Sequence, residues 1–203
     1  MTTRLAVITA GLTEPSSTRL LAERLTESVV RALPTGDVVT EVIEVREIAH
    51  DLTNNVLTGF ASPQLQVRLD AITEADALIV STPIYTASYS GLFKMLVDVL
   101  PADSLRGKPV LLGATGGTAR HSLAIDHALR PLFAYLGALV APVAVFAASE
   151  DWGSVEAGRL DARIDRAGAD FVRIVAGSPA PRATDPFADV TPFEALLQDT
   201  PRS

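Results

Sequence analysis

Three consecutive hydroxyl residues, Ser16, Ser17 and Thr18, stand where a phosphate group could be bound. They follow a loop containing Gly11 and Pro15 and precede apolar residues at helical spacing. Ser and Thr are preferred at helix N-caps, where their oxygens accept from the free N–H groups of the first turn. Those N–H groups and the positive end of the helix dipole attract phosphate. An ordinary capped helix explains the same residues, so other loops must decide between the two interpretations.

The elements that must position these hydroxyls alternate between strands and helices. Strands are predicted at residues 5–10, 38–45, 77–81, 110–114 and 140–147, the last broken by Pro142. Helices are predicted at residues 20–29, 64–75, 91–100, 122–136 and 155–175. Residues 46–62 lack clear periodicity and are predicted to form a long loop. This alternation predicts an α/β fold, a doubly wound five-stranded parallel sheet in a three-layer α/β/α arrangement.

Three loops of this predicted sheet follow the carboxyl ends of strands. They comprise residues 11–17 after the first strand, 82–90 after the third and 115–118 after the fourth. In open parallel sheets, ligands bind outside the carboxyl ends of the strands. The three loops therefore share one edge of the sheet, which favours a binding site over a simple capped helix.

Known nucleotide and hydrolase motifs are missing from these loops. The sequence has no G-x-x-x-x-G-K-[ST], no G-x-G-x-x-G after the first strand and no G-x-S-x-G. Several hydroxyls without a Lys suit a terminal phosphate monoester, such as the one FMN carries. Residues 83–86 offer a rigid, partly apolar wall for a flat heterocycle, and Gly116 and Gly117 let backbone N–H groups approach its carbonyls. Donors fixed there would stabilise the negative charge that a flavin gains on reduction.

Composition excludes several other classes. The chain has 203 residues, of which 48% are hydrophobic and 20% charged, enough for one α/β domain. The absence of Cys excludes disulfides, thiolate nucleophiles and iron–sulfur clusters, and the three His lack metal-ligand spacing, so no metal site is predicted. A net charge of −7 argues against nucleic acid. We see neither a membrane span nor a signal segment and expect a cytoplasmic protein.

Three motifs in order carry a family resemblance. They lie at residues 10–19, at 82–85 with 90–94, and at 114–117 with His121 and residues 129–132. Together they resemble the NAD(P)H-dependent FMN reductase family, which has a flavodoxin-like fold. The similar branch supplies reduced FMN to a separate luciferase-like monooxygenase. The resemblance implies a domain at residues 1–177, FMN and NAD(P)H as cofactors, and a homodimer or homotetramer; residues 178–203 form a Pro-rich tail or arm beyond it.

The resemblance also implies the residues of the flavin site. The phosphate is assigned to Gly11, Thr13, Ser16, Ser17, Thr18 and Arg19. The isoalloxazine ring is assigned to Pro83, Ile84, Tyr85 and Thr86, and its pyrimidine end to Thr115, Gly116 and Gly117, with His121 nearby. No residue is assigned to acid or base catalysis, because a hydride can pass directly between stacked rings. Many members carry a basic residue in the first loop, whereas here Thr13 and Glu14 stand there, which suggests that FMN is released rather than kept.

Several side chains keep two interpretations. Arg19 reaches the phosphate or is a solvated helix residue, and Tyr85 packs on the flavin or fills a gap between loops. His121 contacts a cofactor or is a plain polar residue, and Trp152 lies near the flavin edge or forms a lid.

Residues 91–100 are apolar nearly all round, so a second subunit is expected to cover part of this helix. Within it, Lys94 and Asp98 are expected to pair across that interface, because Lys before Asp is the weaker order for an intrahelical pair.

Two other functions remain open at the level of sequence. One is a quinone or azo reductase on the same scaffold that holds FMN firmly. The other is a non-enzymatic flavodoxin-like electron carrier, with which the acidic net charge is compatible.

Overall fold

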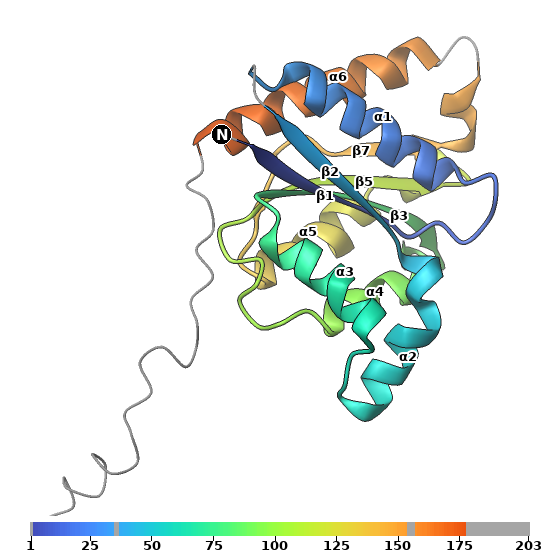
Figure 1. Ribbon diagram of the computed structural model, residues 1–203. Coiled ribbons are helices and arrows are strands. Elements are labelled where there is room, and N and C mark those ends of the chain that lie inside the picture. Colours follow the sequence, from blue (N-terminus) through green and yellow to red (C-terminus); the bar gives the residue numbers. More distant parts are fainter. Residues whose placement is uncertain (1, 35–36, 154–156, 178–203) are drawn as a thin grey trace, which may run out of the picture.

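A parallel sheet runs through the middle of the computed structural model, which describes residues 2–34, 37–153 and 157–177 (Figure 1). The predicted tail at 178–203 lies outside the described residues. The strands are β1 (Thr3–Thr9), β2 (Val38–Glu44), β3 (Ala77–Tyr85), β4 (Ser88–Tyr89), β5 (Pro109–Gly116), β6 (Leu139–Val140) and β7 (Val145–Ala148). The order across the sheet is β2-β1-β3-β5-β6, which confirms the doubly wound arrangement.

The fifth position of the sheet is shared by two short strands. β6 pairs with Pro109 and Val110 at the start of β5, and β7 pairs with the end of β5 from Gly113 onward. Both are parallel to β5. The interruption contains Pro142, as expected, because Pro cannot donate to a ladder.

Helices cover both faces of the sheet. On one face lie α1 (Ser17–Ala32) and α6 (Ala157–Gly177), side by side in Figure 1. The other elements are α2 (Ala49–Thr58), α3 (Pro63–Glu74), α4 (Gly91–Asp98) and α5 (Arg130–Tyr135), with 3₁₀ turns η1 (Val45–Ile48), η2 (Ala119–His121) and η4 (Ser149–Trp152) and a π-helical turn η3 (Ile125–Leu129).

Both faces of β1 are buried, as the continuous apolar run predicts. Leu5 and Val7 pack in the core beneath α1 and α6, whereas Ala6 and Ile8 pack in the core on the opposite face. Burial on both faces leaves the loops at the strand ends as the accessible part of the sheet.

The loop predicted at residues 46–62 is wrong. This segment forms η1 and α2, and α2 ends at Gly59 in the left-handed conformation with φ of 78°. Leu52 is the buried residue of α2, so the helix has no apolar stripe for periodicity to reveal.

The loop predicted at residues 82–90 is also largely wrong. β3 continues to Tyr85, and β4 returns antiparallel to it through Thr86 and Ala87. Pro83 is tolerated because the pairing of β3 with β1 has already ended at Ser81.

The predicted intersubunit pairing of Lys94 is wrong. Its Nζ donates to both carboxylate oxygens of Asp98 within α4, at 2.6 and 2.8 Å. The hydrogen bond that Lys94 donates to Asp98 raises the pKa of Lys94. α2 packs against α4, and Leu92 and Met95 are half-buried against the same core. Part of the apolar surface expected to need a second subunit is therefore covered within the chain.

Candidate functional site

The carboxyl ends of β1, β3 and β5 meet around a hollow of about 180 Å³. All three predicted loops contribute to it, which confirms that they converge on one edge. The hollow is lined by Gly11, Leu12, Thr13, Ser16, Ser17, Thr18, Pro83, Ile84, Tyr85, Thr115, Gly116, Gly117 and Ser149. Charged side chains are missing from this lining, so its polar groups are hydroxyls and backbone.

The first loop brings its hydroxyls to the start of α1. Ser16 is the N-cap residue, and its Oγ accepts a hydrogen bond of 3.2 Å from the backbone N–H of Arg19. The N–H groups of Ser17 and Thr18, at the start of this turn, have no acceptor within the helix. These donors and the helix dipole make this end of α1 suited to an anion.

Gly11 is required by the close approach of the first loop to α1. A Cβ on Gly11 would lie 2.1 Å from Ser16 Oγ and 3.2 Å from Thr18 Cβ. Any side chain at this position would therefore displace Ser16 from its capping position.

Buried hydroxyls join the first loop to the neighbouring strands. Thr18 Oγ1 and Thr115 Oγ1 share a hydrogen bond of 2.8 Å, and both residues are buried. Ser81 Oγ donates to the carbonyl of Thr18 at 3.0 Å, and Ala10 N–H donates to the carbonyl of Ser81 at 3.0 Å. The hollow is therefore held by bonds that link β1, β3, β5 and α1 directly.

A tight hairpin forms the opposite wall. Tyr85 ends β3 and is 46% exposed, while Thr86 and Ala87 form the turn with φ of 48° and 68°. Positive φ at both central residues is the conformation of a type I′ hairpin turn, which Asn and Gly adopt more readily. Tyr89 on β4 packs edge-to-face on Phe93 at 5.7 Å, which supports the hairpin from below the turn.

Three predicted residues do not line the hollow. Thr86 is at the tip of the hairpin turn, and His121 is an exposed residue of η2 whose Cβ is 3.8 Å from the Cβ position of Gly116. Arg19 faces two carboxylates instead. Leu12 and Ser149 line the hollow but were not predicted. Ser149 follows β7, and the carboxyl end of that strand was the available signal.

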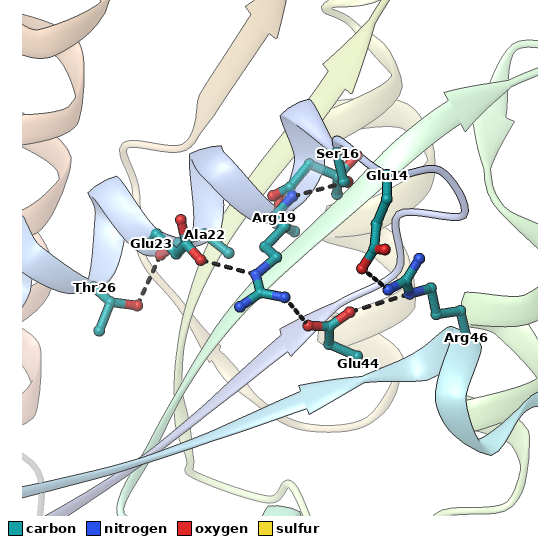
Figure 2. A network of polar contacts seen from close by, with 10 residues as sticks. Glu14, Ser16, Arg19, Ala22, Glu23, Thr26, Glu44 and Arg46 are labelled. Atoms are coloured by element: carbon teal, nitrogen blue, oxygen red, sulfur yellow. Dashed lines mark hydrogen bonds and ion pairs between the residues drawn. The ribbon is translucent and has the colours of Figure 1, made fainter.

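An ionic network occupies the outer side of the first loop (Figure 2). Arg46 of η1 is ion-paired with Glu14 and, through its Nε, with Glu44 at 3.2 Å. Glu44 also pairs with Arg19, whose Nε reaches Glu23 at 2.8 Å. The hydrogen bond with Glu23, and then the charge of Glu44, raise the pKa of Arg19. The solvated-helix interpretation of Arg19 thus matches the structure, with carboxylates as its partners.

Trp152 lies near the first loop but outside the 13 residues of the hollow. It lines an adjoining, larger hollow of about 680 Å³ with residues 13–17, Arg19 and Arg24, and Thr13, Ser16 and Ser17 line both hollows. The guanidinium of Arg24 is 5.3 Å from the centre of the Trp152 ring.

Within residues 2–34, 37–153 and 157–177, no group of three or more His, Asp or Glu is placed to hold a metal ion. No helix in these ranges is long and apolar enough to cross a membrane.

Comparison with known proteins identifies the family of this arrangement. Residues 3–153 match the family model described as NADPH-dependent FMN reductase. The chain belongs to the NADPH-dependent FMN reductase family. Its members reduce FMN with NAD(P)H, and the matched residues include all three loops of the hollow.

Individual relatives of this FMN reductase agree. NADH-dependent FMN reductase SfnF of Pseudomonas putida is 43% identical over 147 residues, covering 72% of this chain and 78% of SfnF. An FMN reductase (NADPH) of Pseudomonas aeruginosa is 39% identical over 149 residues, covering 73% and 78%. The X-ray structure of an oxidoreductase from Corynebacterium diphtheriae superposes with a TM-score of 0.84 at 40% identity, covering 88% of this chain and 99% of that one.

Proposed function

We propose that the hollow at the start of α1 binds the phosphate of FMN and that the hairpin wall and the Gly116–Gly117 segment flank its ring. The observation that carries this proposal is the buried hydrogen bond between Thr18 and Thr115, at 2.8 Å. It joins the start of α1, on the phosphate side of the hollow, to the end of β5, on the ring side. The donor set fits a phosphate monoester, since hydroxyls and N–H groups of a helix start are placed together without a competing carboxylate.

The residues of the chain act by binding and orienting. The chemistry supplied by bound FMN is acceptance of a hydride from NAD(P)H. Pro83 and Ile84 are buried within the sheet and form the base of the wall, while Tyr85 is exposed enough to meet a ring. Backbone N–H groups near Gly116 and Gly117 can donate toward the ring carbonyls, where negative charge increases on reduction. No side chain is assigned a proton-transfer role.

The test of this site is a flavin titration with Ser16→Ala and Thr18→Ala combined. We expect FMN affinity to fall by about tenfold or more, since the Ser16 hydroxyl at the phosphate and the hydrogen bond from Thr18 to Thr115 are both lost. Ser62→Ala is the matched control, because Ser62 caps α3 in the same way, accepting from Leu65 N–H at 3.1 Å. Unchanged FMN affinity in the double variant would refute the assignment of the first loop.

We propose further that the protein releases reduced FMN to a flavin-dependent monooxygenase. Supporting this, the hollow is walled by an exposed loop and an exposed Tyr85, and Arg19 is engaged by carboxylates rather than available to the phosphate. A phosphate held without a cation binds more weakly than one paired with Arg or Lys.

A steady-state assay tests release. If FMN is a substrate, NAD(P)H oxidation requires added free FMN and saturates with it. Reduction of quinones or azo compounds without added flavin would favour the reductase with tightly held FMN. Bound FMN without any NAD(P)H oxidation would contradict the family assignment and favour an electron carrier.

A further inference from the structure

Glu14 is an acidic residue within the loop that we assign to the phosphate. It lies between Thr13, which lines the hollow, and Pro15, and it is two residues from the N-cap Ser16. Two residues of chain span less than about 8 Å, comparable to the Debye length at physiological ionic strength. A free carboxylate at this distance would repel a phosphate dianion, so the loop needs a means to neutralise it.

Arg46 supplies the opposing charge from a distant part of the sequence. It lies 32 residues after Glu14, in the turn η1 that follows β2, and its Nη2 donates to the carboxylate of Glu14 (Figure 2). The Arg46 side chain is 28% exposed, and that of Glu14 is 65% exposed. The arginine is thus the more buried partner of the pair.

Glu44 orients this arginine. Its side chain is only 13% exposed, and it accepts from Arg46 Nε at 3.2 Å while pairing with Arg19 through its other oxygen. Glu44 engages the Nε of Arg46, so the Nη2 of Arg46 is left for the carboxylate of Glu14. Arg19 is not equivalent, because Glu23 on its own helix occupies it.

We propose that Arg46 is a positioning residue for FMN that acts through Glu14: it neutralises the acidic first loop and thereby sets the preference for phosphorylated over unphosphorylated flavin. The proposal rests on the phosphate site described above. It accounts for an acidic residue in a phosphate-binding loop, because the compensating cation comes from η1 on the outer side of the loop.

The experiment compares FMN with riboflavin, which lacks the phosphate. Binding of both flavins is titrated for the wild type and for Arg46→Gln, Arg46→Lys, Glu14→Gln and the double variant Glu14→Gln/Arg46→Gln. In Arg46→Gln, FMN affinity is expected to fall about three- to tenfold, while riboflavin affinity stays within about twofold. High salt should shrink this loss, since it screens the freed carboxylate.

Two variants separate charge from structure. Arg46→Lys should keep most of the wild-type preference, and the double variant should return it to within about twofold of wild type because the repelling carboxylate is gone. Arg68→Gln is the matched control. Arg68 of α3 forms a partly exposed ion pair with Glu41 of β2, at 2.9 Å. Loss of this pair should leave the preference for FMN over riboflavin unchanged.

The outcomes distinguish this proposal from the one it rests on. Equal loss of FMN and riboflavin affinity in Arg46→Gln, or no recovery in the double variant, overturns the role of Arg46 while the phosphate site stands. Equal affinity of the wild-type protein for both flavins instead overturns the phosphate site itself.

Discussion

The two sides of the first loop are built from different chemistry. The inner side presents hydroxyls held by buried neutral hydrogen bonds, of which Thr18 with Thr115 is the central one. The outer side carries Glu14, Arg46, Glu44, Arg19 and Glu23 in an ionic network, in which Glu14, Arg19 and Glu23 are exposed to solvent and Glu44 and Arg46 are partly buried. Neutral donors therefore define the shape of the site, and charges are kept where solvent and salt can weaken them. This separation agrees with the release of FMN that we propose.

Filling the inner side should have the largest effect. Gly11→Ala places a Cβ 2.1 Å from Ser16 Oγ, so the capping serine must move and the hollow shrinks. FMN affinity is expected to fall by more than about tenfold, which a fluorescence titration measures. Gly158→Ala is the control, since its Cβ would have no neighbour within 4 Å. Wild-type affinity in Gly11→Ala would show that the inner geometry is not needed.

Lys108 is a buried charged residue far from the first loop, in contrast to the exposed charges of the outer side. Lys108 precedes β5 at the opposite edge of the sheet, is fully buried and donates to the carbonyls of Ile72 and Thr73, each at 2.7 Å. Burial lowers the pKa of Lys108 from 10.5 to about 8. Between these values the unfolded chain binds a proton that the folded chain has lost, so the free energy of unfolding rises with pH, by at most about 3 kcal/mol.

This pH dependence can be isolated by comparison with Lys108→Met. Urea denaturation between pH 7 and 10 should show the wild type gaining stability relative to the variant as pH rises, with most of the gain above pH 8. Parallel profiles for the two proteins would contradict the lowered pKa.

Removing one partner of the hydrogen bond between Thr18 and Thr115 should lower the free energy of unfolding by less than the upper limit given for Lys108. Thr115→Val leaves the hydroxyl of Thr18 buried without its partner, which is expected to lower the free energy of unfolding by about 1–3 kcal/mol. Adding Thr18→Val should recover part of the stability, because no hydroxyl then remains unpaired. Denaturant unfolding of the two single variants and the double variant measures this coupling. Additive losses would mean that the two hydroxyls act independently.

Breaking the outer network at Arg19 should have the smallest effect. The Arg19 side chain is 48% exposed, and solvent-exposed ion pairs contribute little to stability. Arg19→Gln is therefore expected to change both the free energy of unfolding and FMN affinity little, within about twofold for affinity. A tenfold loss of FMN affinity would restore Arg19 to the phosphate site.

Much of the fold could be predicted from local pattern, because the strands are short apolar runs between turn residues. The helix at residues 49–58 could not, since it buries only Leu52 and has no side chain capping its start. The strand through Pro83 was also hidden, because whether a Pro is tolerated depends on where the neighbouring strand ends.

The candidate site divides in the same way. Ser16, Thr18 and Thr115 were predictable because strand ends of a parallel sheet meet at one edge. The partners of Arg19 and Glu14 were not, since Glu44 and Arg46 are brought to them by the pairing of β1 with β2. Contacts between residues 25 and 32 positions apart leave no local signal in the sequence.

The phosphate site is tested most directly by the affinity of the wild-type protein for FMN and for riboflavin, measured by titration under identical salt. We expect FMN to bind at least about tenfold more tightly, because the inner hydroxyls and the start of α1 meet its phosphate. Equal affinities would contradict the phosphate site, since the hollow would then bind the ring without using the phosphate.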